Sequence, residues 1–241
     1  MTDANFKYAE ISDINRSISE IEIFLAIYKI LKKDLNREQN KKLGKCLYFA
    51  FIDFLNKQHC KPKKAYYNKD SYYNHLKKYK KYINKHNINR KANISPNKPK
   101  RNGDCCWIHL HHINEALFLN LGSPISIYKK YSQYKANDYK DEEAWIYSNF
   151  WNYDNHKSEN LVRCNVLEHA FLHAIIIIAF DVPNFDKKNN GYESLKKNVK
   201  HLYSSESRYL YTDFVYRDGS NIYIYERRIT DIINELDGLI K

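Results

Sequence analysis

The sequence predicts an α+β fold, because long segments with helical spacing of apolar residues occur together with short strand-like runs. The clearest helical segment covers residues 17–35, where Ile21, Phe24, Tyr28 and Leu31 form an apolar stripe. The other segments with this spacing are 37–57, 166–180 and a C-terminal stretch that contains Ile229, Ile232, Ile233, Leu236 and Leu239. Because residues 166–180 are apolar on most sides, we expect that helix to be buried.

Two of these helices begin with a capping pattern, in which a polar residue is followed three positions later by Glu. Ser17 and Glu20 form this pattern in the first helix, and Asn165 and Glu168 form it before residues 166–180. Such side chains bind the backbone N–H groups that have no partner within the first turn. The two patterns therefore predict where each helix begins.

Strands are predicted in three places. The runs 106–113 and 161–164 are short and rich in large side chains, as strands are. Near the C-terminus, the Tyr-rich segments 209–217 and 221–227 flank Asp218-Gly219, which is a strong signal for a hairpin turn. The C-terminal region is therefore predicted to hold a β-hairpin followed by the last helix.

These signals divide the 241 residues into four regions. The first is helical, the second is basic and rich in tyrosine, and the third carries the candidate chemistry. The fourth is an accessory or recognition region with the hairpin and the last helix. The bounds are 1–60, 61–104, 105–182 with a long insertion at 114–159, and 183–241.

The net charge of +12 is concentrated in the second region. Between Lys61 and Arg101 the chain has fourteen Lys or Arg residues and one acidic residue, Asp70. Basic side chains neutralise phosphates, and interleaved tyrosines can stack on bases. The tyrosines are Tyr66, Tyr67, Tyr72, Tyr73, Tyr79 and Tyr82. The residues expected to contact nucleic acid are Lys77, Lys78, Lys80, Lys81, Arg90 and Lys91. A solvated linker is the alternative interpretation.

The five cysteines form no C-x-x-C pair and their number is odd, so the sequence predicts neither a disulfide framework nor a zinc ribbon. Reduced thiols are typical of cytosolic proteins. The first residues do not form a signal peptide, and the longest apolar run, Ala174–Phe180, is too short to span a bilayer. We therefore expect a cytoplasmic protein without a membrane partner.

Five residues form the candidate site, namely His111, His112, Asn160, His169 and His173. The first two end a predicted strand, Asn160 opens another, and His169 and His173 are four residues apart on a predicted helix. Residues at i and i+4 project from one helical face, so these two imidazoles can share a metal ion. Adjacent strand residues point to opposite faces, so if His111 faces the metal, His112 faces elsewhere.

This pattern resembles the signature of HNH (His-Me finger, ββα-metal) endonucleases. It is similar to phage HNH homing endonucleases, in which an N-L-V…E-H…H segment follows a strand bearing H-H-I, and to bacterial DNase toxins. The matching residues are His111-His112-Ile113 and the block from Asn160 to His173. The resemblance covers about residues 105–180 and implies a ββα-metal nuclease core there.

The resemblance also implies a role for each residue. His112 is the general base that activates water, and Asn160 supports the geometry that orients its imidazole. His111, His169 and His173 bind a single divalent ion. A histidine with an ordinary pKa of about 6.5 suits a base at neutral pH, and a metal relieves charge on the phosphate. The identity of the ion stays open among Mg, Mn and Zn.

The sequence therefore predicts a metal-dependent endonuclease of the homing or restriction type that hydrolyses double-stranded DNA. Three alternatives stay open: a nuclease that cleaves RNA, a non-specific nuclease, and an inactive nucleic-acid-binding protein with a structural metal. A palindromic target would indicate a homodimer, because symmetric sites match symmetric proteins.

Overall fold

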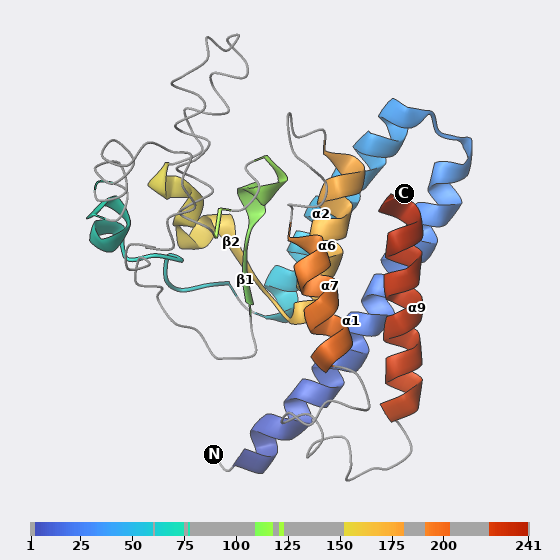
Figure 1. The fold of residues 1–241 in the computed structure, drawn as a ribbon, viewed down its shortest axis with the longest axis horizontal. Coiled ribbons are helices and arrows are strands. Elements are labelled where there is room, and N and C mark those ends of the chain that lie inside the picture. Colours follow the sequence, from blue (N-terminus) through green and yellow to red (C-terminus); the bar gives the residue numbers. More distant parts are fainter. Residues whose placement is uncertain are drawn as a thin grey trace, which may run out of the picture. The chain divides into compact units, whose positions relative to one another are not determined.

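A computed structural model describes residues 3–59, 61–74, 77, 109–117, 121–122, 152–180, 191–202 and 222–240. Within these ranges, residues 3–14, 201–202 and 222–226 are described by their backbone alone. The chain divides into two units, 1–51 with 165–241, and 52–164 (Figure 1). Helices build the first unit and a small two-stranded sheet lies in the second, so the secondary structure is of the α+β kind.

Helix α1, Asp3–Leu31, is longer than the predicted helix and is followed by a short 3-10 turn, η1 (Lys32–Asp34). Ser17 lies in the interior of α1, so the predicted capping box of Ser17 and Glu20 is wrong. An N-cap residue needs a non-helical backbone, and here the chain is helical from Asp3 onward.

Helix α2, Arg37–Gln58, confirms the helix predicted over 37–57. It starts with a reciprocal cap that the sequence analysis missed. The Asn36 side chain accepts from the backbone N–H of Gln39, and the Gln39 side chain accepts from the backbone N–H of Asn36, each at 2.9 Å. An N-x-x-Q pattern is the sequence signal for such a start.

Helix α6, Val166–Ala179, confirms the predicted buried helix and its cap. The Asn165 side chain accepts from the backbone N–H of Glu168, and the Glu168 side chain accepts from the backbone N–H of Asn165. Near its other end, Gly44 of α2 permits a close approach, since a Cβ there would lie 2.6 Å from the Cβ of Ala179.

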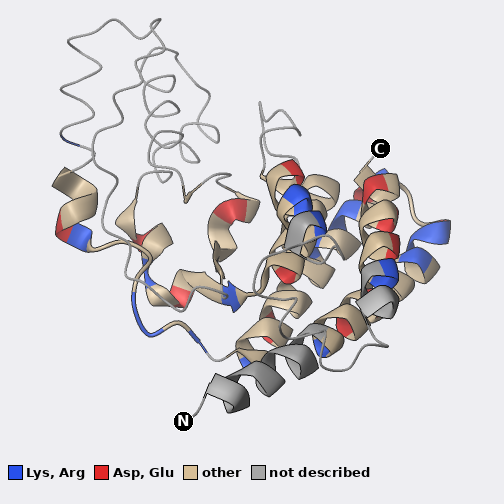
Figure 2. Ribbon diagram, turned by 60° about the horizontal axis from the view of Figure 1, so that its bottom comes forward, with Lys and Arg blue, Asp and Glu red and all other residues tan. Residues whose placement is uncertain are grey.

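Two more helices of the first unit are α7 (Tyr192–Leu202) and α9 (Ile222–Ile240). Both pack against α6, and α9 also packs against α1 (Figure 1). Acidic and basic residues occur together along these helices (Figure 2). Two ion pairs link α1 and α9, Glu22 with Arg228 at 2.6 Å and Lys29 with Glu235 at 2.7 Å.

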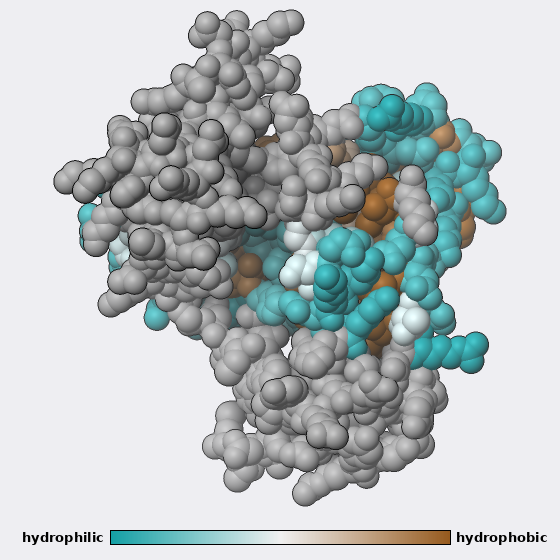
Figure 3. All heavy atoms as spheres, in the orientation of Figure 1, coloured by the Kyte–Doolittle hydropathy of each residue, from teal (hydrophilic) through white to brown (hydrophobic). Residues whose placement is uncertain are grey.

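Aromatic residues fill the core of the first unit. The rings of Phe24, Phe51 and Phe171 meet edge to face, with centroids 4.6 to 6.3 Å apart. Buried aliphatic residues lie around these rings. On the surface over these helices, apolar side chains are visible among hydrophilic ones (Figure 3). Because each edge-to-face pair adds to the free energy of burial, this cluster holds α1, α2 and α6 together.

The second strand of the predicted C-terminal hairpin is wrong, because residues 222–227 form the first turns of α9. The first strand and its turn, within 209–221, lie outside the described residues. The Tyr- and Ile-rich composition favours strands locally. The helix instead buries an apolar stripe, and this burial outweighs the weak local preference. The stripe consists of Ile229, Ile232, Ile233 and Leu236.

The sheet of the second unit pairs β1 (His109–His112) with β2 (Leu161–Cys164) in antiparallel fashion. In this register His111 lies opposite Val162 and His112 lies opposite Leu161. Strand β2 confirms the predicted run 161–164. Strand β1 is shorter than the predicted 106–113 at its C-terminal end, where the chain turns into the 3-10 segment η2.

Three 3-10 segments flank the strands, η2 (Ile113–Ala116), η3 (Tyr153–His156) and η4 (Ser158–Asn160). Segment η2 follows β1 directly, whereas η3 and η4 lead into β2. The core beside them contains Tyr67, Tyr72, Leu121 and Tyr153, with Ala65 and Tyr66 packed against it. Among the helices in the described part of the chain, none combines the length and apolar character that crossing a membrane requires.

Candidate metal centre

Two histidines of α6 converge one turn apart. The Nε2 atoms of His169 and His173 are 3.2 Å apart and their ring centroids are 4.9 Å apart. His173 is 4% exposed and His169 is half-buried. Two ring nitrogens at this distance can share one proton as donor and acceptor, or they can share one metal ion. The pair has the i, i+4 relation that the sequence predicted.

A buried network fixes the start of α6 beside this pair. The Glu168 carboxylate is fully buried and accepts from Ser17 Oγ at 2.6 Å and from the backbone N–H of Asn165 at 2.7 Å. The Asn165 side-chain amide donates to Ser17 Oγ at 2.9 Å. A buried carboxylate is costly unless it is hydrogen-bonded, so these bonds give this end of α6 a defined position against α1.

A glycine lies against the ring of His173. Gly191 has φ +92°, which L side chains rarely adopt, and a Cβ there would lie 3.3 Å from His173 Cε1. Its carbonyl accepts from the backbone N–H of Leu195 in the first turn of α7. Position 191 therefore requires glycine for both its backbone conformation and its contact with the imidazole.

A second pair of potential ligands lies in the second unit, where β1 passes into η2. His111 is fully buried, and its Nδ1 lies 3.4 Å from Oε2 of Glu115. The 3-10 turn of η2 places Glu115 beside the histidine four residues earlier. The other carboxylate oxygen, Oε1, accepts from the backbone N–H of Gly122 at 3.4 Å. Glu115 is buried as well, at 5% exposure.

His111, Glu115, His169 and His173 are side chains of the kinds that could hold a metal ion. His169 and His173 belong to the first unit, and His111 and Glu115 belong to the second. The three histidines are those predicted as ligands. Glu115 was missed by the sequence analysis, although its position four residues after His111 is a usable signal. Three imidazoles and a carboxylate suit a first-row transition metal or zinc.

His112 makes different contacts from its neighbour. It is 1% exposed, and its Nε2 lies 2.9 Å from Nδ1 of His156. Its other ring nitrogen, Nδ1, lies 3.8 Å from Oε1 of Glu115. The Tyr66 ring lies 4.4 Å from the His112 ring, centroid to centroid. The base proposed from the sequence is thus a buried side chain, with one nitrogen toward His156 and the other toward Glu115.

His156 itself is enclosed by aromatic rings. It is fully buried, and the ring centroids of Tyr72 and Tyr67 lie 4.6 and 4.9 Å from its own. Burial lowers the pKa of His156 from 6.5 to about 3, so the ring is neutral at ordinary pH. Burial likewise raises the pKa of Tyr72. Within the described residues, Nε2 of His156 has no hydrogen-bond partner.

The side chain of Asn160 forms a hydrogen bond with the backbone of the loop before β2. Its side-chain amide donates to the carbonyl of Asp154 at 2.8 Å, within η3. The carbonyl of His156, at the end of the same segment, accepts from the backbone N–H of Tyr66 at 2.8 Å. Asn160 therefore supports the segment that carries His156 and does not itself contact His112 in the described hydrogen bonds. Nothing in the spacing of the sequence pointed to His156.

The predicted nucleic-acid segment is described only at its start. Lys77 is exposed, and Lys78, Lys80, Lys81, Arg90 and Lys91 lie outside the described residues. Tyr67 and Tyr72 are 1% and 0% exposed, so the expectation that these two could stack on bases is wrong. They have a structural role, because they enclose His156 and pack on Tyr153. Tyr73 is 47% exposed.

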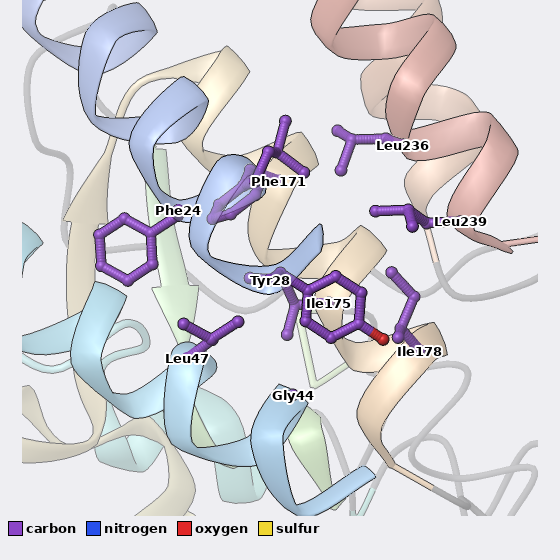
Figure 4. Close-up of a pocket in the computed structure, with 10 residues that line it drawn as sticks. Phe24, Tyr28, Gly44, Leu47, Phe171, Ile175, Ile178, Leu236 and Leu239 are labelled. Atoms are coloured by element: carbon purple, nitrogen blue, oxygen red, sulfur yellow. The ribbon is translucent and has the colours of Figure 1, made fainter. Parts of the chain in front are cut away.

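An apolar cavity in the first unit is separate from this chemistry. It lies among α1, α2, α6 and α9, and its volume of about 20 Å³ corresponds to roughly one water molecule (Figure 4). Phe24, Tyr28, Phe171 and Ile175 are among the residues that line it. A small cavity with apolar walls offers no polar partners for a substrate, so it is a packing defect of the core.

Comparisons with known proteins leave the centre to be judged on its own geometry. No family model matches the chain, and no curated protein and no solved structure matches it.

Proposed function

We propose that this chain is a metal-dependent endonuclease of the HNH type that hydrolyses phosphodiester bonds of DNA. The observations that carry the proposal are two pairs of potential ligands, His169 with His173 on α6 and His111 with Glu115 at the end of β1, which we propose bind one ion together. The adjacent strand residue, His112, supplies an imidazole beside Glu115. Ligands on a strand end and a following helix, with a second histidine next to the first, are the arrangement that the sequence pattern implies.

One divalent ion bound by this group would supply the Lewis acid. Such an ion neutralises charge on a phosphoryl oxygen and stabilises the departing O3′. The donor set fits this ion, because neutral imidazoles and a carboxylate are ordinary ligands of Zn and Mn. The burial of His111, Glu115 and His173 keeps water from competing for the ligand atoms.

His112 is the residue proposed to take the proton of the attacking water. Its Nε2 contacts His156, so the proton of the water would go to Nδ1, which requires His112 to carry its own proton on Nε2. Glu115 lies near both the proposed metal ligand and the proposed base, because its Oε2 is near His111 and its Oε1 is near His112. A carboxylate in that place can bind the metal and also stabilise the imidazolium that forms when His112 is protonated.

The choice of DNA as substrate rests on charge. The segment from Lys61 to Arg101 is strongly basic, and a polyanion is the partner that such a segment attracts. The homing or restriction role, the preference for duplex DNA and the homodimer predicted for a palindromic site belong to the same proposal. Cleavage of single-stranded DNA and RNA beside duplex DNA tests them directly.

The decisive experiment is cleavage of supercoiled plasmid by the purified protein with EDTA, Mg²⁺, Mn²⁺ or Zn²⁺. His112→Ala and His111→Ala are compared with His109→Gln, a change on the same strand outside the ligand group. We expect metal-dependent cutting by the unmodified protein and by His109→Gln, and a loss of about 100-fold or more in the other two. Equal cutting by all four proteins would exclude the proposed centre.

A second candidate function is favoured by the number of ligands. Four protein ligands close a tetrahedral site, and closed sites are typical of structural zinc, whereas catalytic zinc keeps a position for water. The chain would then be a nucleic-acid-binding protein with a structural ion. Tight binding of one Zn²⁺ per chain, with no cleavage of DNA or RNA under any metal, would favour this second function.

A further inference from the structure

Helix α1 carries a group of exposed aliphatic side chains on one face. Ile23, Ile27 and Ile30 are 50%, 42% and 65% exposed, and Leu31 beside them is 49% exposed. Residues 23, 27 and 30 are separated by four and three positions, so their side chains follow one another along the same face of the helix. Single exposed apolar residues are ordinary, whereas a contiguous group marks a surface that associates. These four residues are called the α1 stripe.

The α1 stripe lies apart from the contacts that α1 makes within its own unit. The core side of α1 includes Ile21 and Leu25, which are 0% and 4% exposed. At 3.6 residues per turn, these positions are nearly opposite residues 23 and 27. Glu22 and Lys29 form ion pairs with residues of α9. The core and α9 therefore contact two sides of the helix, and the stripe faces away from the core.

Charged residues continue the line of the stripe beyond both of its ends. Arg16 and Glu20 precede it, and Asp34 in η1 follows it. Along residues 16, 20, 23, 27, 30 and 34 the intervals alternate between four and three. This alternation is the seam of a two-helix coiled coil, in which the side chains of one helix pack between those of the other. The face is therefore suited to pairing with a second helix.

The placement of charge on this face fits a second copy of the same helix. An antiparallel pair in which Ile23 of one copy faces Ile27 of the other is centred on position 25. The pair of Arg16 and Asp34 has the same centre, so these exposed and opposite charges also face each other. Every contact occurs twice, as a two-fold axis requires. In a parallel pair each charge would instead meet its own like, which is unfavourable.

From this pattern we propose that the chain forms a homodimer in which the α1 stripes of two copies pack in antiparallel fashion. In this register Glu20 faces Ile30 of the second copy, where its carboxylate loses hydration without gaining a partner. A single pair of helices is a small interface, so we expect a weak dimer that dissociates at roughly micromolar concentration. The interface does not rest on the proposed nuclease function, although a two-fold dimer would suit a palindromic target.

The first test is sedimentation velocity of the full chain in EDTA without nucleic acid, over protein concentrations from roughly 1 to 200 μM. Ile27→Glu places a charge in the stripe, and Leu117→Glu is the matched control at an exposed apolar residue outside α1. We expect the unmodified protein and Leu117→Glu to dimerise alike, and Ile27→Glu to dissociate at least about tenfold more readily. Circular dichroism checks that all three proteins are folded.

A charge exchange tests the antiparallel register. Arg16→Glu alone and Asp34→Arg alone each bring like charges together at both ends of the dimer, so we expect each to raise Kd by about 3- to 10-fold. The double variant restores both attractions and should return Kd to within about twofold of the unmodified protein. Recovery identifies a second copy as the occupant, because only a homodimer contains both exchanged charges.

Glu20→Leu is expected to strengthen the dimer, because it extends the apolar seam and removes a carboxylate that loses hydration. We expect Kd to fall by about tenfold or more, with no species larger than a dimer, since a two-fold interface is closed. An unchanged Kd in this variant would show that residue 20 lies outside the interface and that the proposed register is wrong.

The remaining outcomes keep the dimer and the proposed function apart. A protein that is monomeric at every concentration, or that dimerises equally well as Ile27→Glu, overturns the dimer even if it cuts DNA. A double charge variant that stays as weak as the single ones overturns the antiparallel pairing. A dimer that behaves as expected, formed by a protein that cuts no nucleic acid under any metal, leaves this inference intact while the proposed function fails.

Discussion

The Nε2 atoms of His169 and His173 lie 3.2 Å apart on successive turns of α6. Two imidazoles in this relation repel each other if both are protonated, and they bind one ion well if neither is. The start of the helix is fixed by the buried Ser17–Glu168 bond, and Gly191 lies against the second ring. The pair is therefore arranged before any ion binds, which lowers the cost of ordering the ligands.

Replacing His169 with alanine is expected to weaken Zn²⁺ or Mn²⁺ binding by more than about 100-fold, because loss of a ligand exceeds the 10- to 100-fold effect of losing an outer partner. Calorimetric titration with the metal alone measures this. In the unmodified protein, metal at about 100 times Kd should raise the free energy of unfolding by about 2.7 kcal/mol. His109→Gln is the matched control, and equal affinity in His169→Ala would contradict the centre.

Substitution of Glu115 tests whether the residues at the junction of β1 and η2 bind the same ion as His169 and His173. Glu115→Gln keeps the shape of the side chain and removes its charge, so we expect at least about tenfold weaker metal binding. Glu159→Gln, a change at an exposed side chain of the loop before β2, serves as the control. If Glu115→Gln binds metal normally while His169→Ala does not, the ion is held without the carboxylate, and the four-residue group is wrong.

Gly191→Ala is expected to disturb both the fold and the centre. Alanine at φ +92° is strained by roughly 1–2 kcal/mol, and its Cβ would press on the His173 ring at 3.3 Å. We expect a lower free energy of unfolding in urea together with weaker metal binding. Gly238→Ala is the control, because nothing lies within 4 Å of its Cβ position and alanine favours a helix. An unchanged metal affinity in Gly191→Ala would show that the ring can move aside.

Much of the fold was predictable where the local and tertiary preferences agree. The helix 166–179 combines an apolar run with an N-x-x-E cap, and α2 combines an apolar face with a favourable start. The prediction of the second hairpin strand was wrong because a Tyr- and Ile-rich run at 222–227 suits a strand locally but forms the first turns of α9. The Ser17 cap failed for a related reason, since the hydroxyl satisfies a buried carboxylate on another helix.

The candidate site was predictable only where spacing carries the information. His111, His169 and His173 were identified because residues on one strand end and one helical face have fixed spacing. Glu115 depends on the 3-10 turn of η2, which no periodicity signals. The position of His156 depends on tyrosines from a distant segment of the sequence, so its contact with His112 arises only in the tertiary structure. The basic composition that indicated base stacking gave no means of recognising Tyr67 and Tyr72 as core residues.

Ser17→Ala removes the hydroxyl that donates to Glu168. The carboxylate then stays buried with one bond fewer, and we expect the free energy of unfolding to fall by roughly 1–3 kcal/mol. Because Asn165 also loses a partner, the start of α6 should loosen and metal binding should weaken slightly. Ser19→Ala is the control, since its hydroxyl makes an exposed contact with Arg228. Equal urea midpoints in the two variants would argue against a structural role for the buried network.

The burial of His156 predicts a specific dependence of stability on pH. Its pKa is lowered to about 3 in the folded protein and lies near 6.5 in the unfolded chain. Between these values the unfolded state binds a proton that the folded state does not. The free energy of unfolding therefore falls as the pH drops below about 6.5, and this loss continues toward the folded pKa. His112 and the tyrosines face the ring, and the tyrosines stay neutral throughout this window.

His156→Phe removes this contribution and leaves every other titrating group in place, including His109, whose pKa burial also lowers. Urea unfolding of the metal-free proteins at pH about 7 and about 5 measures the difference. The unmodified protein should lose about 2 kcal/mol more than the variant between these two values, since each pH unit below the unfolded pKa is worth about 1.4 kcal/mol. Parallel losses in the two proteins would mean that His156 is protonated, and reached by water, in the folded state.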